Sequence, residues 1–181
     1  MMNKRELLNK KEIEITIERL CQQLIENHSD FKETVIVGVQ PRGTFLSKRI
    51  ISQLELLVSP DLIQNGNIDI SFHRDDLMRR SEPIVPEVMD MDFSVEGKNV
   101  VLVDDVLYTG RSIRSAIDAL MAFGRPNTVE LLVLINRRFS RHLPIQPNYV
   151  GRTIDAIDSE RVIVEWEELT AKDRVLMIKS V

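Results

Sequence analysis

The chain has 181 residues, of which 43% are hydrophobic and 29% charged, and its formal net charge is −4. This composition excludes a disordered chain, and the negative charge disfavours a general affinity for nucleic acid. The single cysteine, Cys21, excludes a disulfide framework and a cysteine zinc cluster, which indicates a reducing compartment. No signal peptide and no membrane span are predicted. We therefore expect one cytoplasmic domain over 1–181.

A helix is predicted near the N-terminus, because Ile13, Ile17, Leu20 and Leu24 share one helical face. Cys21 lies beside that face, so we expect a core cysteine rather than a nucleophile.

The next element, over 34–39, is a continuous apolar run rich in β-branched residues, and it predicts a buried parallel strand. A helical pattern resumes at about Phe45. The loop between them, which consists of Gln40, Pro41, Arg42 and Gly43, offers backbone N–H groups and a guanidinium to a diphosphate. Taken alone, the same residues fit a plain turn between a strand and a helix.

A strand is predicted over 68–72, where apolar and polar residues alternate. The polar stretch that follows, 73–97, has no convincing periodicity. A loop of this length inside a compact domain is usually functional or mobile.

The segment after the next buried strand, 99–103, carries most of the chemistry. Asp104 and Asp105 end that strand, and Thr109 to Ser112 begin a helix that extends to about Phe123. A helix N-terminus favours a phosphate, and two carboxylates suit ribose hydroxyls or a hydrated Mg²⁺. One loop could hold both ends of a ribose 5-phosphate. The alternative, a solvated acid pair before an ordinary helix, does not account for the fixed spacing of these residues.

Further strands are predicted over 130–135, 162–166 and 175–178. Continuous apolar strands that alternate with helices predict an α/β fold with a doubly wound, mainly parallel sheet flanked by helices. Ligands bind such sheets beyond the carboxyl ends of the strands, which is where the two polar loops fall.

The segment 99–112 resembles the phosphoribosyl-diphosphate (PRPP) signature of type I phosphoribosyltransferases. The resemblance implies a small hood, contributed by about 136–181, and a flexible active-site loop at about 74–97. It also implies catalytic roles for Asp104, Asp105 and Arg42, and Mg²⁺ that is bridged through PRPP without a direct protein ligand. The implied ribose and 5-phosphate site comprises Asp104, Asp105, Val106, Leu107, Tyr108, Thr109, Gly110, Arg111 and Ser112, and the implied diphosphate site comprises Gln40, Pro41, Arg42 and Gly43.

In that family the corresponding flexible loop folds over the bound substrate. The matching residues here are Arg74, Asp75, Asp76, Arg79 and Arg80, of which the last two arginines could supply cations to the diphosphate. The competing interpretation is a solvated charged turn.

Three segments, 72–77, 103–111 and 143–145 with 149–151, together resemble the PyrR family of pyrimidine-operon attenuation regulators with uracil phosphoribosyltransferase activity. The resemblance implies the reaction of uracil and PRPP to UMP and diphosphate, a homo-oligomer and a messenger RNA leader as partner. Asn136 and Arg137 stand where purine-salvage enzymes lead into a lysine, which disfavours 6-oxopurines. Arg137 and the backbone at Val162 are the candidates for base contacts.

His28, His73 and His142 are interpreted as surface residues, since no histidine stands out as a general base.

The sequence departs from the usual PyrR pattern in two places. The family form Asp-Arg-Gly-His-Arg is replaced by a longer segment at 136–142, and the N-terminal helix keeps Arg19 but has Glu18, Gln22 and Asn27 around it. Candidates for RNA contacts are Arg19, Arg138 and Arg141. Two alternatives stay open: an RNA-binding attenuator with weak or no catalysis, and a phosphoribosyltransferase for another base such as hypoxanthine.

Overall fold

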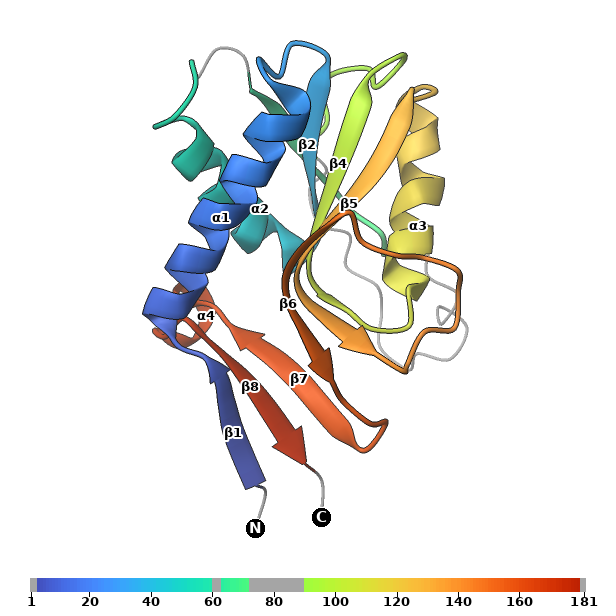
Figure 1. The fold of residues 1–181 in the computed structure, drawn as a ribbon. Coiled ribbons are helices and arrows are strands. Elements are labelled where there is room, and N and C mark those ends of the chain that lie inside the picture. Colours follow the sequence, from blue (N-terminus) through green and yellow to red (C-terminus); the bar gives the residue numbers. More distant parts are fainter. Residues whose placement is uncertain (1–2, 60–62, 72–89, 180–181) are drawn as a thin grey trace.

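The computed structural model describes residues 3–59, 63–71 and 90–179, and the chain in these ranges forms two β-sheets with helices around the larger one (Figure 1). The larger sheet has five parallel strands in the order β3-β2-β4-β5-β6. These strands are β2 (Thr34–Val39), β3 (Gln64–Ile68), β4 (Asn99–Leu107), β5 (Thr128–Arg138) and β6 (Tyr149–Asp155).

Helices cover both faces of the larger sheet, which confirms the doubly wound arrangement (Figure 1). The helices α1 (Lys10–His28) and α2 (Gly43–Leu54) lie on one face, and α3 (Arg111–Leu120) lies on the other. Two hydrophobic clusters correspond to these two layers, and alternate residues of β2 and β4 contribute to each. Strands that are buried on both faces need continuous apolar runs, which explains the sequence pattern of 34–39.

The smaller sheet is antiparallel and has the strand order β1-β8-β7, with β1 (Asn3–Leu8), β7 (Glu160–Glu165) and β8 (Arg174–Lys179). The sequence placed the hood in about 136–181, whereas this sheet also takes a strand from the N-terminus. The segment 149–155, which lies within the expected hood, forms β6 of the larger sheet instead.

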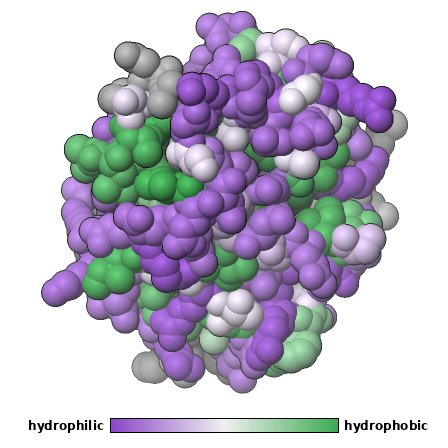
Figure 2. Space-filling model, turned by 45° about the horizontal axis from the view of Figure 1, so that its top comes forward, coloured by the Kyte–Doolittle hydropathy of each residue, from purple (hydrophilic) through white to green (hydrophobic). Residues whose placement is uncertain are grey.

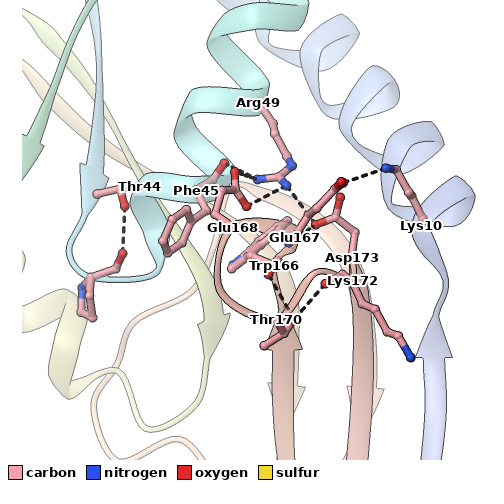
Figure 3. A network of polar contacts seen from close by, with 11 residues as sticks. Lys10, Thr44, Phe45, Arg49, Trp166, Glu167, Glu168, Thr170, Lys172 and Asp173 are labelled. Atoms are coloured by element: carbon pink, nitrogen blue, oxygen red, sulfur yellow. Dashed lines mark hydrogen bonds and ion pairs between the residues drawn. The ribbon is translucent and has the colours of Figure 1, made fainter.

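A polar network joins the smaller sheet to α2, as Figure 3 shows. The short helix α4 (Glu167–Thr170) follows β7, and Arg49 of α2 donates hydrogen bonds to Glu168 at 2.9 and 3.1 Å and to Asp173 at 2.9 Å. The Arg49 guanidinium also lies 4.6 Å from the ring centroid of Trp166, which is fully buried. Nearer the surface, Lys10 of α1 pairs with Glu167 at 2.8 Å.

Two sequence predictions of local structure are wrong. The strand predicted over 68–72 lies earlier, at Gln64–Ile68, because the chain turns after Ile68 and Asp69 accepts a hydrogen bond from the N–H of Ser71 at 2.8 Å. The side chain of His28, expected at the surface, is only 4% exposed. It lies within 3.1 Å of Glu130, Tyr149 and Thr34, which satisfy both ring nitrogens.

The other histidine and cysteine predictions have different outcomes. His142 is exposed, as expected, and His73 lies outside the described residues. Cys21 is fully buried and burial raises the pKa of its thiol to about 12, which confirms the prediction of a core cysteine.

The expected flexible loop falls mostly outside the described residues, which resume at Asp90. From there the chain is held by backbone contacts: Asp90 pairs with Asn67, and the N–H groups of Val95 and Gly97 donate to the carbonyls of Phe123 and Arg125. Val95 is fully buried. The segment 90–97 therefore packs on the domain and does not belong to a free loop.

The surface in Figure 2 is mostly hydrophilic and carries separate hydrophobic patches. Within the described ranges, no helix is both long enough and apolar enough to cross a bilayer.

Candidate functional site

The site lies at the topological switch point of the larger sheet, between β2 and β4, where successive connections run to opposite sides. The chain enters the sheet at β2, places β3 on one side and β4 on the other, and sends α2 and α3 to opposite faces. The loops that follow β2 and β4 therefore lie at the carboxyl edge of the sheet, which is where ligands bind in open α/β sheets. These are the two polar loops singled out in the sequence.

The loop after β4 encloses a cavity of about 220 Å³. Gly110 is the N-cap of α3 and has a φ of 91°, a left-handed conformation that favours glycine. The cavity thus adjoins the N-terminus of a ten-residue helix, where the helix dipole favours an anion. Its lining residues are Asp104, Val106, Leu107, Tyr108, Thr109, Gly110, Arg111, Ser112, Ile113 and Ser115.

Asp104 and Asp105 occupy the last part of β4 rather than the loop beyond it, because the strand continues to Leu107. Asp104 Oδ1 accepts a hydrogen bond from the N–H of Asp105 at 2.9 Å. The Asp105 side chain is buried, and its Oδ2 atom has no hydrogen-bond partner among the described residues. A buried carboxylate oxygen without a partner is costly, so this atom is positioned for a ligand.

The two carboxyl groups do not ionise as ordinary surface acids do. Burial raises the pKa of Asp105 to about 6, although the positive charge of Arg42 acts in the opposite direction. Burial, followed by the charge of Asp105, raises the pKa of Asp104 well above its usual range. Because the groups are adjacent, they titrate as a pair.

The loop after β2 lies directly against β4. A Cβ atom added to Gly43 would come within 2.3 Å of the Val103 carbonyl oxygen and 3.0 Å of the Asp104 Cα, so only glycine permits this approach. The Gln40–Pro41 peptide bond is cis, and Arg42 at the start of α2 is exposed. The structure therefore brings the expected diphosphate loop beside the acid pair, as the sequence predicted for two strands that share one edge.

A second cavity, of about 360 Å³, adjoins the same loop and adds residues that the sequence did not single out. Lys48 follows Thr44 by one helical turn and brings a second cation near Arg42, so helical spacing could have identified it. Asn67 comes from β3, and only strand pairing places it there. The cavity is lined by Gln40, Pro41, Arg42, Thr44, Phe45, Lys48, Asn67 and Leu169.

The two base candidates lie in different sheets. Arg137, near the end of β5, is buried, with its guanidinium 4.0 Å from the ring centroid of Tyr108 and donating to the carbonyl of Ile157 at 3.2 Å. Its Nε–H has no partner among the described residues, and burial lowers its pKa. Val162 lies on β7 of the smaller sheet and pairs with Met177.

The three RNA candidates all make internal contacts. Arg19 donates to the carbonyls of Val150 and Gly151 at 3.1 and 2.6 Å. Arg138 pairs with Asp155 at 2.5 Å, and Arg141 donates to the carbonyl of Tyr108 and to Asn136 Oδ1. The loop candidates Arg74, Asp75, Asp76, Arg79 and Arg80 lie outside the described residues.

The arrangement has a clear chemical sense. Carboxylates can accept hydrogen bonds from vicinal hydroxyls, a helix N-terminus can receive a phosphate, and the guanidinium of the β2 loop can pair with a second anion. A ribose that carries phosphate groups at both ends has this chemistry. The fold is that of a phosphoribosyltransferase domain.

Comparison with known proteins agrees with this class. Residues 3–169 match the phosphoribosyl transferase domain family. The "Bifunctional protein pyrR" of Enterococcus faecalis is 39% identical over 179 residues, which cover 99% of each chain. The "Bifunctional protein PyrR" of Microcystis aeruginosa is 41% identical over 174 residues, which cover 96% of this chain and 97% of the relative. The chain belongs to the PyrR family of phosphoribosyltransferases.

Solved structures share the fold at lower sequence identity. The hypoxanthine phosphoribosyltransferase of Trypanosoma cruzi has a TM-score of 0.72 at 16% identity and covers 98% of this chain and 97% of its own. That of Staphylococcus aureus has a TM-score of 0.71 at 22% identity and covers 97% and 91%. These similarities establish the architecture of the domain.

Proposed function

We propose that this protein is a uracil phosphoribosyltransferase that converts uracil and PRPP to UMP and diphosphate. The observation that carries the proposal is the packing of the β2 loop, through Gly43, against the carbonyl of Val103 beside Asp104. This contact places the β2 loop, which adjoins one cavity, next to the end of β4, whose following loop adjoins another. The choice of uracil rests on membership of the PyrR family.

In the proposed reaction, uracil N1 forms a bond to C1 of the ribose as the bond from C1 to diphosphate breaks. The diphosphate leaves with the electron pair of that bond, and the N1 proton is released. Positive charge develops on the ribose, and the buried carboxylate of Asp105 stabilises it or relays the proton. Arg42 and the backbone of Gln40 to Gly43 receive the negative charge of the diphosphate.

Magnesium is the proposed cofactor. Mg²⁺ keeps several of its waters in proteins and binds together with substrate phosphates. The buried Oδ2 of Asp105, which has no hydrogen-bond partner among the described residues, would accept a hydrogen bond from a water of the ion. The acid pair therefore fits Mg²⁺ that is bridged through PRPP without a direct protein ligand. When bound with PRPP, Mg²⁺ would neutralise charge on the leaving diphosphate.

The remaining contacts are proposed from the resemblance to the family. Arg137 offers its buried Nε–H to a carbonyl of the base, and Val162 offers backbone groups. Arg74, Asp75, Asp76, Arg79 and Arg80 belong to the loop proposed to fold over the substrate. We further propose a single domain, a cytoplasmic location and a homo-oligomer.

A panel of bases, monitored by diphosphate release with Mg²⁺ and PRPP, tests this function. We expect turnover with uracil at a rate at least tenfold above that with hypoxanthine, and no turnover in the Asp104→Asn/Asp105→Asn double variant. Turnover with hypoxanthine but not with uracil would show that the substrate base is a purine and would contradict the proposed substrate. An absence of diphosphate release with every base would refute the catalytic assignment.

A second function, UMP-responsive binding to the leader RNA of pyrimidine genes, is proposed because the matched relatives are named bifunctional. Arg19, Arg138 and Arg141 are its candidate cations, although each already has an internal partner. Filter binding at two salt concentrations, with and without UMP, tests it. Affinity that UMP strengthens and salt weakens supports regulation, whereas binding equal to that of an unrelated hairpin excludes it.

A further inference from the structure

The phosphate-binding loop, Tyr108 to Ser112, is held from outside by the segment that follows β5. Arg141 donates from one guanidinium nitrogen to the carbonyl of Tyr108 and from the other to Asn136 Oδ1 at 2.7 Å. The next two backbone N–H groups, those of His142 and Leu143, both donate to the carbonyl of Thr109, at 3.0 and 3.3 Å. Two consecutive carbonyls of the loop therefore face the segment 141–143.

These contacts fix the orientation of the loop's own N–H groups. The peptide bonds after Tyr108 and Thr109 are trans, and in a trans peptide the carbonyl and the following N–H point in opposite directions. The N–H groups of Thr109 and Gly110 are therefore directed away from 141–143. Thr109 and Gly110 line the 220 Å³ cavity, whereas 141–143 do not. The contacts with 141–143 therefore leave the N–H groups of Thr109 and Gly110 available to an anion in that cavity.

The close packing of Gly110 supports the same interpretation. Its position for a Cβ lies 3.3 Å from the Ile145 Cδ1 atom and 3.6 Å from the Arg141 Cδ atom, so the aliphatic part of Arg141 also packs on the loop. At the other end, Asn136 belongs to β5, next to the base candidate Arg137. A single guanidinium thus links the strand end on the base side to the loop on the phosphate side.

We propose that Arg141 is a positioning residue, which holds the loop of Tyr108 to Ser112 in the conformation that binds the 5-phosphate of PRPP. The inference rests on the proposed function and deepens it. Arg141 touches neither the phosphate nor the reacting atoms. It acts by orienting the backbone that does.

The test compares Arg141→Met and Arg141→Lys with a control, Arg114→Met. Arg114 lies in the first turn of α3, and its side chain is about half exposed and pairs only with Asp118 at 3.0 Å among the described contacts. We expect Arg141→Met to raise the KM for PRPP about tenfold while the KM for uracil changes less than about twofold. Arg141→Lys, which retains one donor, should recover part of the loss, and the control should match the parent.

Calorimetry with ribose 5-phosphate separates this inference from the reaction itself, because binding needs neither uracil nor turnover. We expect the Kd to rise about tenfold in Arg141→Met and by less in Arg141→Lys. If the parent binds ribose 5-phosphate and Arg141→Met binds it equally well, the inference is wrong, whatever the base specificity. If the parent binds neither ribose 5-phosphate nor PRPP, the proposed function fails as well.

Thermal denaturation checks that the Arg141→Met variant is folded before its KM values are compared with those of the parent. If Arg141→Met does not fold, Arg141→Lys carries the comparison, and equal effects of that variant on the KM values for PRPP and uracil would overturn the assignment.

Discussion

Asp105 exposes a conflict between stability and function within a single residue. Its carboxyl group is buried, one of its oxygens lacks a partner among the described residues, and its pKa is raised to about 6. An unfolded aspartate titrates near 3.9, so the native state binds more protons than the unfolded state between about pH 4 and 6. The free energy of unfolding therefore falls as the pH rises through this window.

We predict that Asp105→Asn stabilises the fold and abolishes catalysis. At pH 7.5 the free energy of unfolding should rise by about 2 kcal/mol, because the variant removes a charge that is costly to bury. Urea denaturation at pH 4.5 and pH 7.5 checks the sign, since the advantage of the variant should shrink at the lower pH. A variant less stable than the parent at pH 7.5 would contradict this account of the site.

The same titration predicts the pH dependence of the reaction. Below about pH 6 the acid pair takes up a proton and loses the negative charge that faces the ribose. We expect kcat/KM for PRPP to decline as the pH falls from 7 to 5. Initial rates in buffers of constant ionic strength measure this decline, and a flat profile over that range would remove Asp105 from the catalytic step.

Gly43 provides a residue-scale test of how the two loops meet. We predict that Gly43→Ala costs about 2 kcal/mol of stability and weakens PRPP binding, because its Cβ would overlap the Val103 carbonyl. Chemical denaturation and PRPP calorimetry measure the two effects. Gly97→Ala is the matched control: its Cβ meets no atom within 4 Å, so only its positive φ of 70° is strained and PRPP binding should not change.

Candidate site residues could be proposed from the sequence where they carry a local signature. Asp104 and Asp105 lie in the last part of a buried strand, and Gly110 precedes a helix, which nearby positions reveal. The contact of Arg141 with the carbonyl of Tyr108 was not predicted, because nothing in its own segment shows that it reaches that residue. Likewise, His28 was assigned to the surface, although Glu130 and Tyr149 enclose it from distant strands. Partners far apart in sequence cannot be obtained from one chain by pattern alone.

At the scale of elements, Arg49 connects α2 to the turn between α4 and β8. We predict that Arg49→Met lowers the free energy of unfolding by about 2 kcal/mol, because Asp173, whose side chain is 8% exposed, loses a partner. Lys10→Met is the control, since Lys10 and Glu167 are more than half exposed and such pairs contribute less than about 1 kcal/mol. Urea unfolding of both variants makes the comparison, and equal effects would mean that Arg49 is no more important than a surface pair.

Elements were predictable where their period was strong. The helices α1, α2 and α3 and the strands β2, β4 and β5 have clear apolar patterns, which the structure confirms. The strand β3 has the sequence Gln-Asn-Gly-Asn-Ile, typical of a turn, and it is a strand because it pairs with β2. Half of the residues of β1 are charged and exposed, and the strand forms because β8 lies beside it.

At the scale of the whole molecule, the class of fold was predictable because a parallel sheet buried on both faces imposes its pattern on every strand. The smaller sheet was harder to predict, since it joins the two ends of the chain. Asn3 pairs with Lys179, and Leu8 pairs with Val175.

We predict that deletion of residues 3–8 lowers the midpoint of thermal denaturation by about 10 °C, because Leu7 and Leu8 lose their buried positions and β8 loses a neighbour. Arg152 would also lose its hydrogen bond to the carbonyl of Leu7. Differential scanning calorimetry measures the shift. The control Lys4→Ala changes an exposed side chain of the same strand and should leave the midpoint within about 1 °C.

The pairing of β1 with β8 has a consequence for synthesis. A ribosome makes β1 before the strands of the larger sheet and β8 after them, so β1 has no strand partner until β8 follows. Its charged residues Lys4, Arg5 and Glu6 keep that waiting strand soluble and discourage pairing with other nascent chains. The larger sheet can assemble before β8 is made, whereas the smaller sheet can close only afterwards.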